Sequence, residues 1–422
     1  MKKNLLTLSL IASIATSTFN LSAQTTKRAL FIGNSYTYYN SLPQLTSDVA
    51  LSVGDTLIVD SNTPGGTSFS DHVTNPTSLA LIGEGGWDYV ILQEQSQMPS
   101  FPIGQVEQDV FPFATQLNDL ILTDNPCAET MFYMTWGREE GDASNCAFWP
   151  PVCTYEGMDD LLRERYVMMA EMNEAEVSPV GAVWRHIREN YPDINLYALD
   201  GSHPSPEGSY AAAVCFYTSI FKKNPQLITF NYTIDDAVET IIKNTVETVV
   251  FDAQSTWYHG AYLPAASLNV QVVSDLNFSF ENTSMYANEY YIGIDGQYQA
   301  FTDELNYTFP AAGQYTVSII ASQCGVSDTN EYIVNAGVSN VLNIQQEEMT
   351  IYPNPANGFV MLDMAGQVGT ANVMIFDITG SCVKQINCNK GESISIDELS
   401  AGVYTLQCNM TMKRYVGTLI IE

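Results

Sequence analysis

Short apolar runs alternate with longer amphipathic segments over residues 26–230, and this alternation limits the possible folds more than any other feature of the chain. Runs that are apolar throughout are typical of strands buried on both faces, and apolar residues spaced three or four apart are typical of helices. The expected strands are 29–32, 56–60, 88–93, 130–136 and 194–199. The expected helices are 43–53, 106–122, 159–174, 179–190 and 206–221, with a further one over 234–251. The pattern predicts an α/β domain, in which a parallel sheet carries helices on both faces and ligands bind beyond the carboxyl ends of the strands.

The chain begins with the features of a secretory signal peptide. Lys2 and Lys3 precede an apolar run over 5–14, and small residues suited to cleavage follow at 22–23. We therefore expect residues 1–23 to be removed during export. The apolar run is shorter than the roughly 18 residues of a spanning helix, and no later run reaches that length, so we expect an exported protein without a membrane span.

Acidic side chains outnumber basic ones by 47 to 16, which gives a net charge of −31. This charge repels nucleic acids and anionic membrane surfaces, so neither is expected as a partner. The sequence contains no D-x-D-x-D-G loop and no C-x-x-C pair, which are signatures of calcium and zinc sites. We expect neither a metal nor an organic cofactor.

The segment RALFIGNSYTYYN, residues 28–40, places Ser35 on an abrupt corner after the first expected strand. Gly33 permits a tight turn there, and the backbone N–H groups that follow can stabilise an oxyanion. A serine before a helix is more often only an N-cap. However, Asp200 and His203 lie in the loop DGSHPSPEG, which we place after the last expected strand and at the same edge of the sheet. These residue types can form a nucleophile, a base and an orienting acid, and the alternative is a surface turn with an incidental histidine.

IGNSYT and DGSHPSPEG resemble the first and last sequence blocks of the SGNH (GDSL-like) hydrolases. The resemblance covers about residues 28–221 and implies a flavodoxin-like three-layer α/β/α sandwich with esterase or lipase activity. It also implies that Ser35 is the nucleophile, that its N–H belongs to the oxyanion hole, and that Asp200 and His203 complete a catalytic triad. Asn34 stands where the family more often has aspartate.

The same resemblance implies further oxyanion donors after the second and third strands. The family takes one glycine N–H from its second block, and NTPGGTSFSDH offers Gly65 or Gly66, of which we favour Gly66. An ordinary Pro-Gly turn is the alternative explanation of these glycines. The third block usually provides an asparagine amide, but here the third strand runs into QEQSQ. Gln93, which ends the strand, is the first candidate for that amide donor, and Gln95 is the second.

A long insertion, WGREEGDASNCAFWPPVCTYEGMDD, follows the fourth expected strand and is expected to lie over the site. Trp136 and the other aromatic residues of the insertion can form a wall for a sugar or an acyl group, and Arg138 can contact an acidic substrate. The alternative is that these aromatic residues pack on the domain itself. In an exported chain, Cys146 and Cys153 are expected to form a disulfide within this loop.

The remainder of the chain predicts two all-β sandwich domains. Alternating segments such as QYTVSIIAS favour a small β-sandwich over 265–338, which resembles a PKD-type or immunoglobulin-like module. Within 345–422, IYPNPANGFVML, VMIFDITGSCV and ISIDELSAGVYTLQC resemble the C-terminal sorting domain of the type IX secretion system of Bacteroidota. That resemblance implies the type IX secretion machinery as a partner and export through the periplasm to the cell surface or the medium. The hydrolase-like domain is expected to cover 24–264.

Together these features predict a secreted serine esterase that cleaves carboxylic esters through an acyl-enzyme. No extended apolar lid typical of lipases is recognisable in the sequence, so we expect short acyl groups, acetyl in particular, on a glycan. The alternative is a surface glycan-binding or adhesion protein whose SGNH fold is a weak catalyst. The altered third block and the added β-domains favour that alternative.

Overall fold

The computed structural model describes residues 24–337, 345–363, 371–378, 381–388, 393–409 and 413–421. The expected signal peptide, residues 1–23, lies outside them. The chain divides into two compact units, of which the first ends at Leu263 and the second begins at Pro264. Among the described residues, no helix combines the length and the apolar character that crossing a membrane requires.

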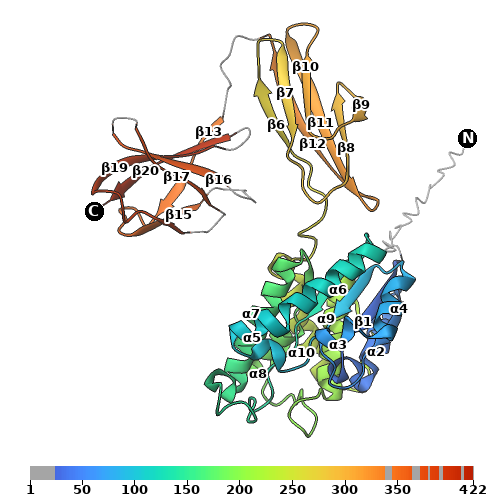
Figure 1. Ribbon diagram of the computed structural model, residues 1–422. Coiled ribbons are helices and arrows are strands. Elements are labelled where there is room, and N and C mark those ends of the chain that lie inside the picture. The colour runs from blue at the N-terminus through green and yellow to red at the C-terminus, as the bar shows by residue number, and fades with distance from the viewer. Residues whose placement is uncertain are drawn as a thin grey trace, which may run out of the picture. The chain divides into compact units, whose positions relative to one another are not determined.

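A five-stranded parallel sheet forms the centre of the first unit (Figure 1). Its strands are β1 (Thr26–Ile32), β2 (Thr56–Asn62), β3 (Tyr89–Leu92), β4 (Glu129–Tyr133) and β5 (Glu176–Ser178). They lie in the order β2-β1-β3-β4-β5, and every neighbouring pair is parallel. This is the strand order of the flavodoxin-like doubly wound fold, so the predicted fold class is confirmed.

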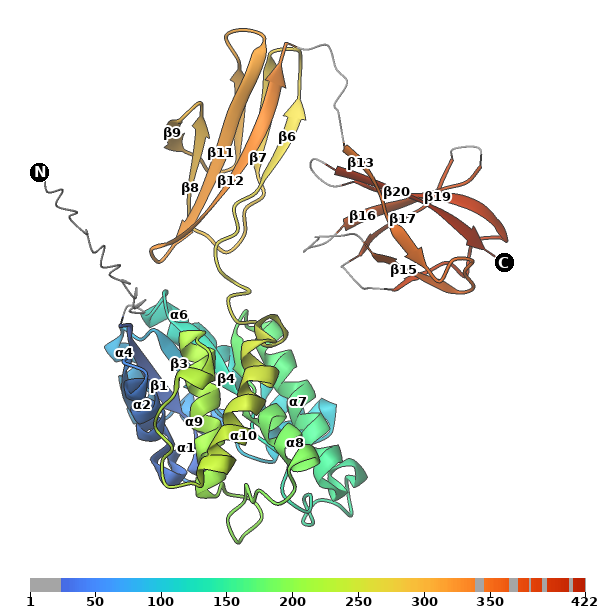
Figure 2. The same ribbon diagram turned by 180° about the vertical axis from the view of Figure 1, so that it is seen from behind.

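Helices cover both faces of this sheet, as the views from opposite sides show (Figures 1 and 2). One face carries α2 (Leu42–Ser52), α8 (Val180–Asn190), α9 (Pro206–Phe221) and α10 (Asp236–Val246). The other carries α3 (Phe69–His72), α4 (Pro76–Glu84), α5 (Ile103–Asp109), α6 (Phe111–Asp124) and α7 (Tyr155–Met172). Alternate side chains of a strand point to opposite faces, so Ala29 and Phe31 of β1 join the first core and Leu30 and Ile32 join the second.

The last strand of the sheet does not lie where the sequence pattern placed it. β5 occupies three residues between α7 and α8, while residues 194–199 form no strand. Within 194–199 only Leu196 and Tyr197 are buried, and Leu199 is fully exposed. The expected strand over 194–199 is wrong, because a strand in this doubly covered sheet would bury its side chains on both faces.

Residues 194–199 instead belong to the connection between α8 and α9. The Ala198 N–H donates to the His203 carbonyl at 2.8 Å, and the Ser205 N–H donates to the Leu196 carbonyl at 2.9 Å. These two bonds fold the segment back on itself as a short hairpin-like loop. The loop that carries the predicted base and acid therefore joins two helices, rather than following a strand.

Three helical segments also differ from the expected ones. The helix expected over 106–122 is divided into α5 and α6, with Pro112 in the first turn of α6, where proline is well tolerated. The sequence pattern missed α4, which begins after Asn75, a residue whose side chain caps the helix. The helix expected over 234–251 is α10 followed by a π-helical turn at Glu247–Phe251.

The second unit begins with seven strands in two antiparallel sheets, of order β10-β7-β6 and β12-β11-β8-β9. These strands are β6 (Leu268–Val272), β7 (Asn277–Asn282), β8 (Glu289–Ile294), β9 (Gln297–Ala300), β10 (Glu304–Thr308), β11 (Gly313–Gln323) and β12 (Val326–Ala336). Both sheets contribute to one core, which includes Phe278, Phe280, Val317 and Ile319. The all-β character predicted for this region is confirmed.

The described part of the C-terminal region is also all-β. Its strands are β13 (Gln345–Glu348), β14 (Thr350–Tyr352), β15 (Phe359–Asp363), β16 (Ala371–Phe376), β17 (Cys382–Cys388), β18 (Ser393–Ser395), β19 (Gly402–Asn409) and β20 (Lys413–Ile421). They form one sheet of order β13-β20-β19-β16-β17 and another of order β14-β15-β18. Val360, Ile375 and Leu406 are among the residues of the core that the two sheets share.

Candidate active site

The turn after β1 places Ser35 at the start of the short helix α1 (Ser35–Tyr38). Asn34 caps this helix, because its Oδ1 accepts a hydrogen bond from the Tyr36 N–H at 3.2 Å. Capping was the alternative explanation for the serine. Since Asn34 is the cap, the Ser35 hydroxyl is left for another partner.

Ser35, His203 and Asp200 lie in hydrogen-bond contact with one another. His203 Nε2 is 2.9 Å from Ser35 Oγ, and His203 Nδ1 is 2.5 Å from Asp200 Oδ2. An ionised carboxylate can only accept hydrogen bonds, so Asp200 holds the ring proton on Nδ1. The lone pair of Nε2 then faces the serine hydroxyl, which is the geometry required of a base and a nucleophile.

Asp200 is kept ionised by donors from its own loop. Its Oδ1 accepts the N–H groups of Ser202 at 3.0 Å and of His203 at 2.9 Å. Partial burial acts to raise the pKa of Asp200, but the hydrogen bonds from His203 and Ser202 outweigh burial and hold that pKa below its ordinary value. Asp200 is therefore a carboxylate at neutral pH, as an orienting acid must be.

Two tyrosines hold the imidazole ring in place. Tyr39 stacks on the His203 ring, with 4.2 Å between centroids and 15° between planes. Tyr36 meets the same ring edge-on, with 5.5 Å between centroids. Such contacts restrict rotation of the ring and favour a positive charge on it. Neither tyrosine was predicted to have a role from the sequence, although both follow Ser35 in the segment SYTYY.

Trp136 lies inside the protein and supports the loop that carries Asp200 and His203, here called the triad loop. It is fully buried and stacks between Tyr36 and Trp184, with centroid distances of 4.8 and 3.7 Å. Its indole N–H donates to the Ser202 carbonyl at 3.1 Å. The predicted contact between Trp136 and substrate is therefore wrong, because the ring is enclosed by protein and holds the loop instead.

Gln93 supports the serine turn and does not face a substrate. It is fully buried, and its Oε1 accepts both the Asn34 N–H and the Thr37 hydroxyl at 2.9 Å. Its amide nitrogen donates to the Glu94 carbonyl. A Cβ at Gly33 would lie 2.7 Å from Gln93 Oε1, so only glycine allows this approach. The prediction that Gln93 donates to an oxyanion is wrong, because its side chain is enclosed beneath the turn.

Gln95 is half-buried in the following turn. Its Oε1 accepts the N–H groups of Gln97 at 2.8 Å and Met98 at 3.2 Å, and its amide nitrogen donates to Gln97 Oε1 at 3.3 Å. A carboxamide carries two N–H donors, and this long bond uses one of them. A role for Gln95 as an oxyanion donor stays a prediction.

The glycine loop after β2 is tied to the serine turn. Thr67 Oγ1 donates to the Gly33 carbonyl at 3.0 Å, and Asn34 Nδ2 donates to the Thr67 carbonyl at 2.9 Å. Gly66 precedes Thr67 and has a φ of 76°, which favours glycine. These contacts hold the Gly66 backbone next to the turn that carries Ser35, and its role as an oxyanion donor stays a prediction.

Two buried titratable side chains, His72 and Glu94, form hydrogen bonds with the serine turn and with the segment that follows the glycine loop. His72 Nε2 is 2.9 Å from the Gly33 carbonyl and Nδ1 is 2.8 Å from Ser78 Oγ, and burial lowers the pKa of His72, which keeps its ring neutral. The Glu94 carboxyl accepts the Phe69 N–H at 3.0 Å, and burial raises the pKa of Glu94 to about 8. Neither residue was predicted from the sequence. The histidine in NTPGGTSFSDH was the available signal.

The insertion after β4 forms a compact loop closed by a disulfide between Cys146 and Cys153. Arg138 stands at the start of this loop, half-buried, with its Nη1 3.4 Å from Asp142 Oδ1. Phe148, at the tip of the loop, is 88% exposed. The structure therefore separates the aromatic residues of the insertion into buried supports, such as Trp136, and exposed ones.

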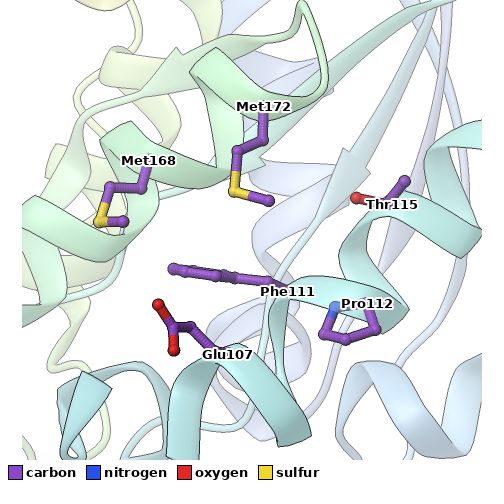
Figure 3. A pocket seen from close by; sticks show the side chains of 6 residues that line it. All are labelled: Glu107, Phe111, Pro112, Thr115, Met168 and Met172. Carbon is purple, nitrogen blue, oxygen red and sulfur yellow. The ribbon is translucent and has the colours of Figure 1, made fainter. Parts of the chain in front are cut away.

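A pocket of about 400 Å³ lies elsewhere in the first unit, among α5, α6 and α7 (Figure 3). Its lining residues are Glu107, Phe111, Pro112, Thr115, Met168 and Met172. They include none of the triad residues, so this pocket is distinct from the candidate active site.

Comparison with known proteins identifies the C-terminal region. Residues 350–422 match the family model of the secretion system C-terminal sorting domain. This match confirms the resemblance that the sequence motifs of this region indicated. No curated protein matches the chain.

Solved structures resemble other parts of the chain. A DUF4886 family protein from Bacteroides uniformis is 16% identical with a TM-score of 0.47, over 53% of this chain and 94% of its own. A protein from Slackia heliotrinireducens, provisionally described as an SGNH hydrolase, is 24% identical with a TM-score of 0.39, over 46% of this chain and 97% of its own. The PKD1 domain of Vibrio anguillarum Epp is 23% identical with a TM-score of 0.17, over 18% of this chain and 96% of its own.

Proposed function

We propose that the first unit is a secreted serine esterase that hydrolyses carboxylic esters, in particular short acyl groups on glycans. The observation that supports this best is the hydrogen-bonded chain from Ser35 through His203 to Asp200, with distances of 2.9 and 2.5 Å. The sorting domain at 350–422 supports export to the cell surface or the medium through the matching secretion machinery.

In the proposed first half-reaction, Ser35 Oγ attacks the carbonyl carbon of the ester while His203 Nε2 takes the hydroxyl proton. Asp200 keeps the ring oriented and stabilises its positive charge. The N–H groups of Ser35 and Gly66, with the Gln95 amide, are the proposed donors to the oxyanion. Collapse of the tetrahedral intermediate breaks the ester C–O bond, and the departing alcohol takes the proton from His203.

The second half-reaction releases the acid. Water attacks the acyl group on Ser35, and His203 accepts a proton from that water as a general base. The second tetrahedral intermediate expels the serine oxygen, which regains its proton from His203. The products are a carboxylic acid and the free enzyme, and no oxidant, reductant or cofactor takes part.

The surroundings of the serine turn support a small acyl group. Tyr38 is 47% exposed, and its hydroxyl would lie 3.7 Å from a Cβ at Gly65. The ring therefore stands over the glycine loop, where the acyl group of a bound ester would meet the proposed oxyanion donors. An exposed aromatic ring there limits the space for a long chain, and it also offers a face on which a sugar can stack.

We expect the wild-type chain to hydrolyse p-nitrophenyl acetate with a kcat/KM at least about tenfold above that for the octanoate, because added methylenes would meet the Tyr38 ring. A fluorophosphonate should abolish the activity. Steady-state kinetics on the acetate, butyrate and octanoate, followed by acetate release from an acetylated glycan, check this. A preference for octanoate would contradict the short-acyl proposal.

A glycan-binding protein without efficient catalysis is the second candidate, and the enclosed side chain of Gln93 favours it because one expected oxyanion donor is absent from the site. The same assays separate the two functions. Saturable binding of glycans without hydrolysis of any acetylated substrate would support the binding protein and end the esterase proposal.

A further inference from the structure

Arg138 stands at the edge of the triad loop. The residues on both sides of it are bonded to that loop, since the Trp136 indole N–H donates to the Ser202 carbonyl at 3.1 Å and the Glu139 N–H donates to the Gly201 carbonyl at 2.9 Å. The backbone that carries Arg138 is therefore fixed against the segment that presents the base. The Arg138 side chain extends from this fixed backbone and is 27% exposed.

The positive charge of Arg138 also acts on Tyr36, the residue that follows the nucleophile in the chain. The Tyr36 hydroxyl lies 2.7 Å from Ser202 Oγ, in the loop that carries the base. Burial raises the pKa of Tyr36, while the bond with Ser202 and the positive charge of Arg138 act to lower that pKa. The field of Arg138 therefore extends to the Tyr36 and Ser202 hydroxyls.

The Arg138 guanidinium makes few hydrogen bonds for a charged, half-buried group. Its nearest carboxylate is Asp142, with 3.4 Å between Nη1 and Oδ1, and its buried Nε has no hydrogen-bond partner among the described residues. Asp142 is already engaged, because its Oδ2 accepts from Gln97 and Asn145 at 2.6 Å each. Four of the five guanidinium N–H donors are thus left without a strong acceptor.

Three other arginines of the first unit, Arg28, Arg185 and Arg188, are bound more fully. Arg28 donates from Nη1 to two backbone carbonyls at 3.0 and 3.1 Å. Arg185 pairs with three carboxylates, and Arg188 donates to a carbonyl and lies over two tyrosine rings. In a chain of net charge −31, a guanidinium with spare donors next to the loop that carries Asp200 and His203 is a place where an anion would be stabilised.

We propose that Arg138, with Ser202, forms a subsite for an anionic group of the substrate, so that the preferred ester is borne by a carboxylated or sulfated molecule such as an acidic glycan. The subsite rests on the esterase function proposed above. A carboxylate or a sulfate would accept hydrogen bonds from the guanidinium and from the Ser202 hydroxyl. The recognised group is spatially separate from the ester that Ser35 attacks.

The test compares three chromogenic acetates of one shape: 5-acetoxy-2-nitrobenzoate, the matching sulfonate and the neutral benzamide. Each kcat/KM is divided by the rate constant for hydrolysis of the same ester by hydroxide, which corrects for differences in the intrinsic reactivity of the three esters. We expect Arg138→Met to lower the ratio of kcat/KM for the anionic esters to that for the neutral ester by about 10- to 100-fold, since a charge-assisted pair is lost. Added salt should reduce the difference in this ratio between the wild type and Arg138→Met, because salt screens the pair between Arg138 and the anion. The carboxylate and sulfonate arms tell the two kinds of anion apart.

Arg163→Met is the matched control, because Arg163 lies on α7 with its guanidinium over the Trp257 ring, and it should keep the wild-type ratio. An unchanged ratio in Arg138→Met, with hydrolysis intact, would overturn the subsite and leave the esterase standing. An equal loss on all three esters with a lower unfolding temperature would make Arg138 a structural residue and also overturn it. No hydrolysis of any ester by the wild type would instead end the esterase proposal.

Discussion

Replacing His203 with alanine is expected to lower kcat for acetate hydrolysis by about four to six orders of magnitude, as loss of the base does in serine hydrolases. The Ser35 hydroxyl would lose the ring nitrogen that lies 2.9 Å from it, His203 Nε2. Without that base the serine cannot be deprotonated as it attacks. Because the His203 side chain is 24% exposed, we expect the free energy of unfolding to change by no more than about 1 kcal/mol. Steady-state kinetics and urea unfolding measure the two quantities.

The matched control for this change is His186→Ala. His186 lies on α8, and its backbone carbonyl accepts a hydrogen bond from Asn190 Nδ2 at 2.8 Å. We expect His186→Ala to keep wild-type kcat within about twofold, since the substitution is the same but the ring does not face the serine. Retention of more than about one hundredth of wild-type kcat by His203→Ala would show that another group acts as the base.

Replacing the two glutamines after β3 by leucine is expected to affect different properties, mainly stability for Gln93 and mainly kcat for Gln95. Gln93→Leu leaves the buried Asn34 N–H and Thr37 hydroxyl without the acceptor that lies 2.9 Å from each, so we expect the free energy of unfolding to fall by about 2–4 kcal/mol. Gln95→Leu removes a proposed oxyanion donor from a half-buried side chain. We expect it to lower kcat by about 10²–10³-fold. Stability should fall less than in Gln93→Leu, because the N–H groups that lose their acceptor belong to the half-buried residues Gln97 and Met98. Urea unfolding and steady-state kinetics on both variants separate the two roles.

Gln105→Leu serves as the control for this pair, since Gln105 is exposed on α5. It should change neither the free energy of unfolding nor kcat. If Gln93→Leu left stability unaltered and lowered kcat alone, Gln93 would be the oxyanion donor after all. If Gln95→Leu retained full kcat, the hole would consist of backbone N–H groups only.

Sequence patterning predicted four of the five strands because each of those strands is a run of apolar residues in a doubly covered sheet. β5 was not predicted because it is only three residues long and two of its residues, Glu176 and Ser178, are polar although buried. Residues 194–199 have a strand-like composition, but Leu199 points to solvent. Burial of a short segment depends on what packs against it, which the local pattern does not contain.

The residues of the candidate site also include some whose roles the sequence predicted and some whose roles it did not. Ser35, Asp200 and His203 were predicted from motifs whose residue types and order carry a recognisable chemistry, and the structure places them in contact. Gln93 and Trp136 have suitable chemistry for the roles first assigned, but their side chains point into the protein. Whether a residue at the end of a strand faces the site or the core is decided by tertiary packing, so the sequence alone could not separate these cases.

Export of the chain would determine where the proposed esterase meets its substrate. The sorting-domain match at residues 350–422 supports a location outside the cell, where acidic polysaccharides are accessible to an unattached or surface-bound hydrolase. The net charge of −31 would repel such polymers at low ionic strength. A positive subsite at Arg138 would give a local attraction within that negative surface.

Whether Ser35 becomes the acylated residue can be read from its peptide after the full chain reacts with a fluorophosphonate. We predict one adduct, located by tandem mass spectrometry on Ser35, and none on the Ser35→Ala variant under the same conditions. An adduct on a different residue with Ser35 unmodified, or equal labelling of the two proteins, would contradict the assignment of Ser35 as the nucleophile.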